Sequence, residues 1–138
     1  METMAPLRPT VQRPRRMLLT AAPTSVAVAR GQVRSAIFGW DVPVDVETAV
    51  LLTSELVTNA IAHEAGETVM LTITCICGQL RVDVHDTSRA EPVPVDVPLE
   101  AETGRGLMLV ASLSTDWGYH RTQSGKAVYF TLAFKDGL

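Results

Sequence analysis

The sequence is poor in the residues on which several classes of protein depend. Only 5% of the 138 residues are aromatic, and the formal net charge is −3. A protein that binds nucleic acid uses a basic surface, often with aromatic platforms for single strands, so no direct nucleic-acid binding is expected. No apolar run approaches the roughly 20 residues of a membrane-spanning helix, so no membrane partner is expected either.

Cysteine is also scarce. Cys75 and Cys77 are the only two, and they stand two positions apart in an alternating segment. As strand residues they would point to the same face, without ready disulfide geometry. A metal site would need two further ligands, for which His63 or His85 could only be guessed at. We therefore interpret both as buried, reduced thiols of a cytoplasmic protein.

The N-terminal segment needs a separate interpretation. Residues 1–16 are rich in proline and arginine and are predicted to be a disordered basic tail, followed by one domain over residues 17–138. Residues 13–31, "RPRRMLLTAAPTSVAVARG", imitate a signal peptide, with arginines, an apolar run and an Ala-Val-Ala ending. Pro23, Thr24 and Ser25 interrupt that run, and the part after them is better explained as an amphipathic helix.

Hydrophobic residues make up 46% of the chain, enough for one globular core. Apolar positions at helical spacing predict a helix from Ser25 to Gly39, capped by Thr24 or Ser25, and a second helix from a cap at Asp45 to about His63. A third, short helix is expected from Gly104.

Alternating segments predict the strands. They are a short edge strand at 17–22, a hairpin of 68–77 and 80–85 around "CGQL", and a second pair at 116–121 and 126–134 joined by "TQSG". The fold class is therefore α+β: a two-layer sandwich whose sheet is mixed but mostly antiparallel, with the helices on one face.

Three groups of residues suggest a functional site. Glu55, Asn59 and His63 recur every four residues, so they share a helix face, and that face carries no Lys or Arg. Asp86 ends a strand just before the long, proline-containing loop 87–103. Glycines at 104 and 106 open a helix, where free N–H groups can bind an anion. Each has an ordinary explanation as well: a solvated helix face, a turn-forming aspartate, and relief of steric crowding.

Together the motifs resemble the GHKL superfamily of histidine-kinase-like ATPases. "ELVTNAIAH" resembles its N box, "VHDTS" the aspartate of its first glycine box, "TGRGLMLV" its second glycine box and "SGKAVYFTL" its terminal strand. The sequence is most similar to the short members, the RsbW/SpoIIAB-type anti-sigma factor serine kinases and the actinobacterial single-domain ATP-binding proteins. It departs from the superfamily pattern after Asp86, where Thr87-Ser88-Arg89-Ala90 contains no glycine.

The resemblance implies a Bergerat ATP-binding fold with ATP and Mg²⁺ as ligands. It assigns the metal to Asn59, general base catalysis to Glu55 and recognition of the adenine amine to Asp86, and it makes residues 89–103 an ATP lid. The remaining nucleotide-contacting residues that it implies are Ser88, Gly104, Arg105, Gly106, Leu107 and Lys126, with Arg105 neutralising the terminal phosphate. His63 either approaches the phosphates or caps the helix C-terminus, and this choice stays open.

The function implied by the resemblance is that of a cytoplasmic anti-sigma factor with serine/threonine kinase activity toward an anti-anti-sigma protein. Its partners would be a sigma factor, an antagonist of the STAS type, or both, and a homodimer is left open. The alternative is an ATP-dependent binding module that sequesters a regulator without phosphorylating it.

Overall fold

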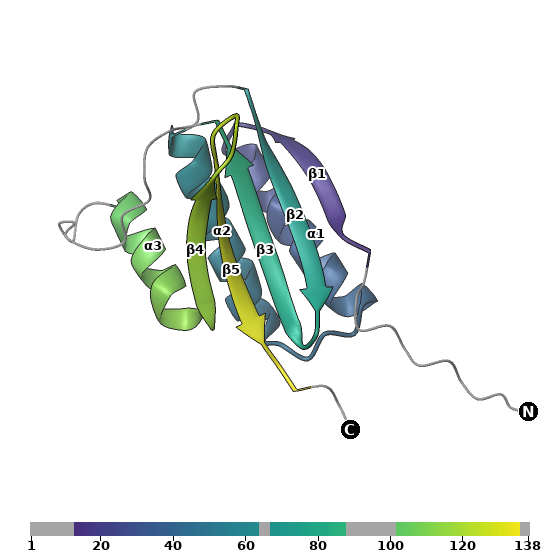
Figure 1. Cartoon of the computed structure of the whole chain (residues 1–138). Coiled ribbons are helices and arrows are strands. Elements are labelled where there is room, and N and C mark those ends of the chain that lie inside the picture. Colours follow the sequence, from purple (N-terminus) through teal and green to yellow (C-terminus); the bar gives the residue numbers. More distant parts are fainter. Residues whose placement is uncertain (1–12, 64–66, 88–101, 136–138) are drawn as a thin grey trace, which may run out of the picture.

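The computed structural model describes residues 13–63, 67–87 and 102–135. Its elements are, in chain order, β1 (Arg15–Thr20), α1 (Thr24–Gly39), α2 (Val46–His63), β2 (Thr68–Ile76), β3 (Gln79–Asp86), α3 (Glu102–Leu113), β4 (Asp116–Arg121) and β5 (Lys126–Ala133). Figure 1 shows the sheet as one layer with α1 and α2 behind it and α3 beside β4. The predicted α+β sandwich and the predicted order of elements are confirmed.

The five strands form a sheet in the order β1-β2-β3-β5-β4. All four pairings are antiparallel, so the described part of the sheet has none of the parallel pairing that a mixed sheet would contain. β5, the last strand in the chain, lies between β3 and β4. This position places Lys126, at the start of β5, opposite Asp86, at the end of β3.

The two long helices begin in different ways. Pro23 occupies the N-cap position of α1, and no side chain caps this helix. The predicted cap by Thr24 or Ser25 is therefore wrong; proline's fixed φ already suits the start of a helix. The predicted cap of α2 is confirmed, because Asp45 Oδ2 accepts hydrogen bonds from the Thr48 hydroxyl at 2.6 Å and the Thr48 backbone N–H at 2.9 Å. These bonds, the hydroxyl's first, lower the pKa of Asp45.

The core lies between the helices and the sheet. One face of β2 and β3 is buried at alternate positions, as the alternation in the sequence predicts. α2 packs against both α1 and α3 and also contacts β2, β3 and β5. The largest fully buried side chains are Phe130, Leu52, Leu56, Leu71, Ile73 and Leu80.

The turn between β2 and β3 corrects the prediction for the cysteines. Ile76 pairs with Gln79, so the hairpin closes through the two residues between them. Cys77 and Gly78 both have positive φ, of 50° and 77°, as a two-residue type I′ turn requires. Cys77 therefore leaves the strand and is exposed, whereas Cys75 is buried; the two cysteines are not joined by a disulfide.

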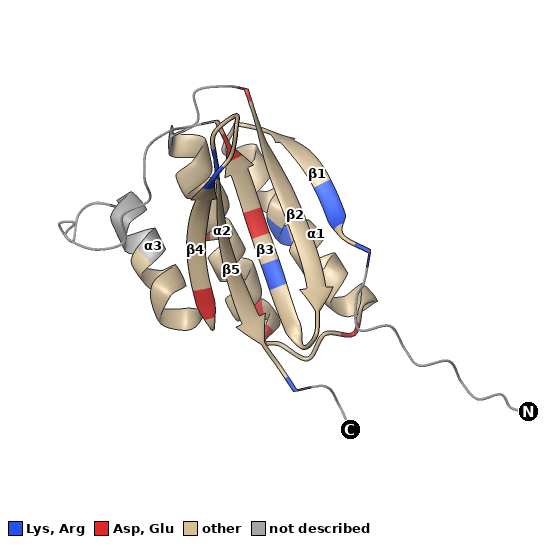
Figure 2. Ribbon diagram, viewed as in Figure 1, with Lys and Arg blue, Asp and Glu red and all other residues tan. Residues whose placement is uncertain are grey.

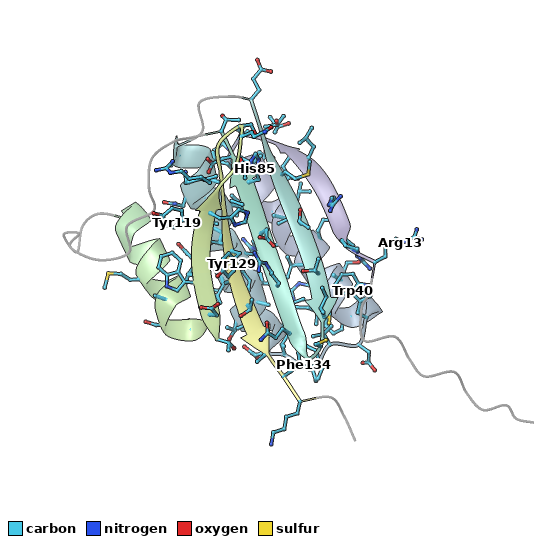
Figure 3. The ribbon with its side chains drawn as sticks, viewed as in Figure 1. Arg13, Trp40, His85, Tyr119, Tyr129 and Phe134 are labelled. Atoms are coloured by element: carbon cyan, nitrogen blue, oxygen red, sulfur yellow. The ribbon has the colours of Figure 1, made fainter. Side chains whose placement is uncertain are left out.

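The face of the sheet that is turned away from the helices carries an ordered polar network. The Arg81 guanidinium donates to both oxygens of Asp83, at 2.9 and 3.0 Å, and lies 3.9 Å from the centre of the Tyr129 ring. The Tyr129 hydroxyl donates to Asp116 at 3.4 Å. Figure 2 shows charges of both signs along β3, and Figure 3 shows Tyr129 and His85 on this face.

No helix in residues 13–63, 67–87 or 102–135 is long and apolar enough to cross a membrane.

Candidate nucleotide site

Several elements that carry predicted site residues begin or end near one end of the molecule. In Figure 1 the end of β3, the turn between β4 and β5, the last turn of α2 and the start of α3 all lie toward the upper end. Contacts of α2 with α3, β3 and β5 bring these elements together. Elements far apart in the sequence thus come together, and Asp86 and Lys126 are paired directly.

The middle of α2 supplies Glu55 and Asn59. Asn59 is only 6% exposed, and its Oδ1 atom has no hydrogen-bond partner among the described residues. A buried amide oxygen without a partner costs free energy, and such oxygens are commonly satisfied by water, a metal ion or a ligand. An amide oxygen is also a ligand that Mg²⁺ accepts, so Asn59 fits the role that the sequence predicts for it.

Glu55 lies one helical turn before Asn59 and is half-buried. Removal of water from its carboxyl raises the pKa of Glu55 above its ordinary value. A carboxylate with a raised pKa holds a proton more strongly, which favours its use as a general base.

Asp86 and Lys126 form a buried ion pair across β3 and β5. Lys126 Nζ lies 3.1 Å from Asp86 Oδ1 and 3.3 Å from Oδ2. The side chain of Asp86 is 1% exposed and that of Lys126 is 3% exposed. Burial of both charges without each other would be strongly unfavourable, so each holds the other in place. The predicted adenine-binding carboxylate is therefore part of a two-residue unit.

The turn between β4 and β5 is fitted closely against the end of β3. Thr122 and Gly125 exchange backbone hydrogen bonds across this turn. A Cβ atom at Gly125 would lie 2.0 Å from the Asp86 carbonyl oxygen, so only glycine allows this approach. On the other face of the sheet, the Thr122 hydroxyl lies 2.7 Å from His85 Nε2. The turn is thus fixed on both faces beside Asp86.

The other predicted residues are described only in part. His63 is the last residue of α2, but its side chain is outside the described part, as is all of Ser88 and the predicted lid from 89 to 101. Residues 104–107 lie within α3, which begins at Glu102, two residues earlier than predicted. An acidic residue favours a helix start, and so the glycines stand inside the first turns. Among the described residues, no group of three or more His, Cys, Asp or Glu side chains could hold a metal ion.

A known protein family matches most of the chain. The sequence model of the histidine kinase-like ATPase domain matches residues 19–132. The chain belongs to this family. The match begins in β1 and ends in β5, so it includes Glu55, Asn59, Asp86 and Lys126.

Among solved structures, the chain is similar to the RsbU and RsbW domains of Rv1364c from Mycobacterium tuberculosis. The TM-score is 0.65 with 18% sequence identity, over 88% of this chain and 32% of that one. This likeness establishes a shared fold, and the chain spans about a third of the length of that structure. No curated protein matches the chain.

Lys126 is one of the predicted site residues, but three features around it were not predicted. They are its ion pair with Asp86, the close approach of Gly125, and the contact of Thr122 with His85. One signal was present: Gly125-Lys126 immediately begins an apolar strand, where a charged residue needs a partner if it faces the core.

Proposed function

We propose that this domain binds ATP with Mg²⁺ and acts as a serine/threonine protein kinase that regulates a sigma factor by phosphorylating its antagonist. The observation that carries the proposal is the pair on α2: a buried amide oxygen without a partner, one turn after a carboxyl whose pKa is raised. Membership of the histidine kinase-like ATPase domain family supports the choice of ATP.

Each residue has a separate task in this proposal. Asn59 would hold Mg²⁺, which, when bound, offsets the charge of the phosphates. Asp86 would accept a hydrogen bond from the 6-amino group of adenine. The first turn of α3 would offer backbone N–H groups to the phosphates, with Arg105 as a charge partner.

Glu55 would act on the protein substrate. It accepts the proton of a serine or threonine hydroxyl while that oxygen forms a bond to the γ-phosphorus and the bond to the ADP oxygen breaks. The raised pKa of Glu55 matches this task, since a stronger base takes up more of the proton in the transition state.

The partners follow from the family resemblance. The proposed substrate is an anti-anti-sigma protein of the STAS type, and the proposed regulated protein is a sigma factor. The proposed location is the cytoplasm, where a sigma factor acts. The shared fold with a structure that contains an RsbW domain supports this assignment.

Transfer of label from [γ-³²P]ATP to a STAS-domain protein encoded in the same genome tests the proposal. Wild type should transfer phosphate, and Glu55→Gln should bind ATP normally but transfer it about 10²–10⁴-fold more slowly. Equal rates would remove Glu55 as the base. Binding of ATP without transfer to any antagonist would instead favour the module that sequesters a partner without phosphorylating it.

A further inference from the structure

Lys126 has more hydrogen-bonding capacity than its ion pair uses. An ammonium group carries three N–H donors. At most two of these donors point to the Asp86 carboxylate, whose oxygens lie 3.1 and 3.3 Å from Lys126 Nζ. No other acceptor among the described residues accepts a hydrogen bond from the third donor. Because the side chain is 3% exposed, solvent does not readily satisfy this donor either.

The buried pair therefore presents a donor beside an acceptor. The Watson–Crick edge of adenine has the complementary order, with the 6-amino donor beside the N1 acceptor. We propose that Lys126 is a second base-reading residue, whose ammonium donates to N1 of adenine while Asp86 accepts from the 6-amino group. This inference rests on the proposed binding of ATP.

The rigidity of the pair makes it a discriminating one. Asp86 and Lys126 belong to different strands, and the backbone of Gly125 fills the space beside the Asp86 carbonyl, so donor and acceptor cannot exchange places. Guanine presents an acceptor, O6, where adenine has the amine, and a donor, N1–H, where adenine has N1. Guanine in the same position would set O6 against the carboxylate and N1–H against the ammonium.

The pair is also suited electrically to a neutral base. The charges of Lys126 and Asp86 cancel, so a neutral purine would bind beside a pair with no net charge. A lone carboxylate at this depth would favour any donor, whereas the ion pair requires a donor and an acceptor together.

The ligand-side test uses wild-type protein and calorimetry with MgATP, Mg-1-deaza-ATP and MgGTP. In 1-deaza-ATP a C–H replaces N1, so a hydrogen bond to a charged group is lost, and we expect about 10–100-fold weaker binding than that of ATP. GTP should bind more weakly still. If 1-deaza-ATP or GTP binds as tightly as ATP, the inference is overturned while the proposed function stands; if ATP itself does not bind, both fall.

The protein-side test uses Lys126→Met. The affinity of this variant for ATP should fall to its affinity for 1-deaza-ATP, so that the two nucleotides bind equally. A merely structural lysine would weaken both together and keep their ratio, which would overturn the inference. Purine riboside triphosphate, which lacks the 6-amino group, should keep its penalty in this variant because Asp86 is still present.

Two further variants keep the test interpretable. Lys126→Met leaves a buried carboxylate without its partner, so the double variant Lys126→Met/Asp86→Asn is measured beside it; it buries no charge, and its amide oxygen still accepts from the 6-amino group. Here too the ratio of ATP to 1-deaza-ATP affinity should be about one, and a ratio equal to that of wild type would overturn the inference. Lys135→Met, at the only other lysine in the sequence, is exposed and should leave the ratio unchanged.

Discussion

Glu55 and Asn59 lie one turn apart on the same face of α2, yet their surroundings differ. The Asn59 side chain is 6% exposed with an unpartnered oxygen, whereas Glu55 is half-buried with a raised pKa. The helix thus carries a buried acceptor and a partly hydrated carboxyl on residues whose Cβ atoms are about 6 Å apart.

Replacement of Asn59 by leucine should stabilise the nucleotide-free protein. Asn59→Leu removes a buried oxygen that has no partner among the described residues, and the free energy of unfolding should rise by about 1–2 kcal/mol. The same change should abolish the dependence of ATP affinity on Mg²⁺. Urea denaturation and calorimetry with and without MgCl₂ measure the two effects. A less stable variant that keeps its Mg²⁺ dependence would contradict the assignment.

The raised pKa of Glu55 predicts a pH dependence of stability. The folded state binds this proton more tightly than the unfolded state does, so the carboxyl's contribution to stability falls as pH rises from the ordinary pKa of a glutamate through the raised pKa of Glu55. Glu55→Gln should therefore be more stable than wild type at pH 7, by less than about 1 kcal/mol, and this advantage should vanish near pH 4. Thermal unfolding from pH 4 to 7 checks the sign; an advantage that grows toward acid would refute it.

Two glycine substitutions should have opposite effects. Gly125→Ala would place a Cβ atom 2.0 Å from the Asp86 carbonyl oxygen, and we expect a loss of about 3 kcal/mol or more. Gly31→Ala is the matched control, because nothing lies within 4 Å of its Cβ position inside α1; it should gain about 0.5–1 kcal/mol. Chemical denaturation of the two variants under the same conditions decides the matter. Equal stabilities would mean that the turn does not press on β3.

The two thiols should differ in reactivity. Cys77 is exposed in the hairpin turn and Cys75 is buried in β2. Ellman's reagent should modify one thiol rapidly in the native protein and two in guanidinium chloride, and Cys77→Ser should remove the fast phase while Cys75→Ser should keep it. Two fast native phases would show that β2 opens readily.

The sequence predicts local features of this protein better than long-range ones. The Asp45 cap and the order of the strands follow from spacing that a few consecutive residues define. The cysteine prediction failed because strict alternation cannot show where a strand ends, and Cys77 adopts a positive φ to form the turn. Proline at position 23 made a side-chain cap unnecessary, which the preference for Thr or Ser at caps could not reveal.

The candidate site divides in the same way. Helical spacing places Glu55 and Asn59 on one face, but the burial of Asn59 depends on packing against other elements that spacing does not describe. The pairing of Asp86 with Lys126 joins residues 40 apart in the sequence, and it depends on β5 entering the sheet beside β3. Nothing in either local segment specifies that neighbour.

The insertion of β5 between β3 and β4 also has a consequence during synthesis. β3 is complete at Asp86, but its partner strand starts only at Lys126, which is 40 residues later. At about 5–20 residues per second, the ribosome needs roughly 2–8 s to make that interval. During this interval one edge of β3 has no partner strand, and Asp86 at its end has no lysine with which to pair. The Asp86–Lys126 pair and the last central strand therefore form together late in synthesis, which ties completion of the ion pair to completion of the sheet.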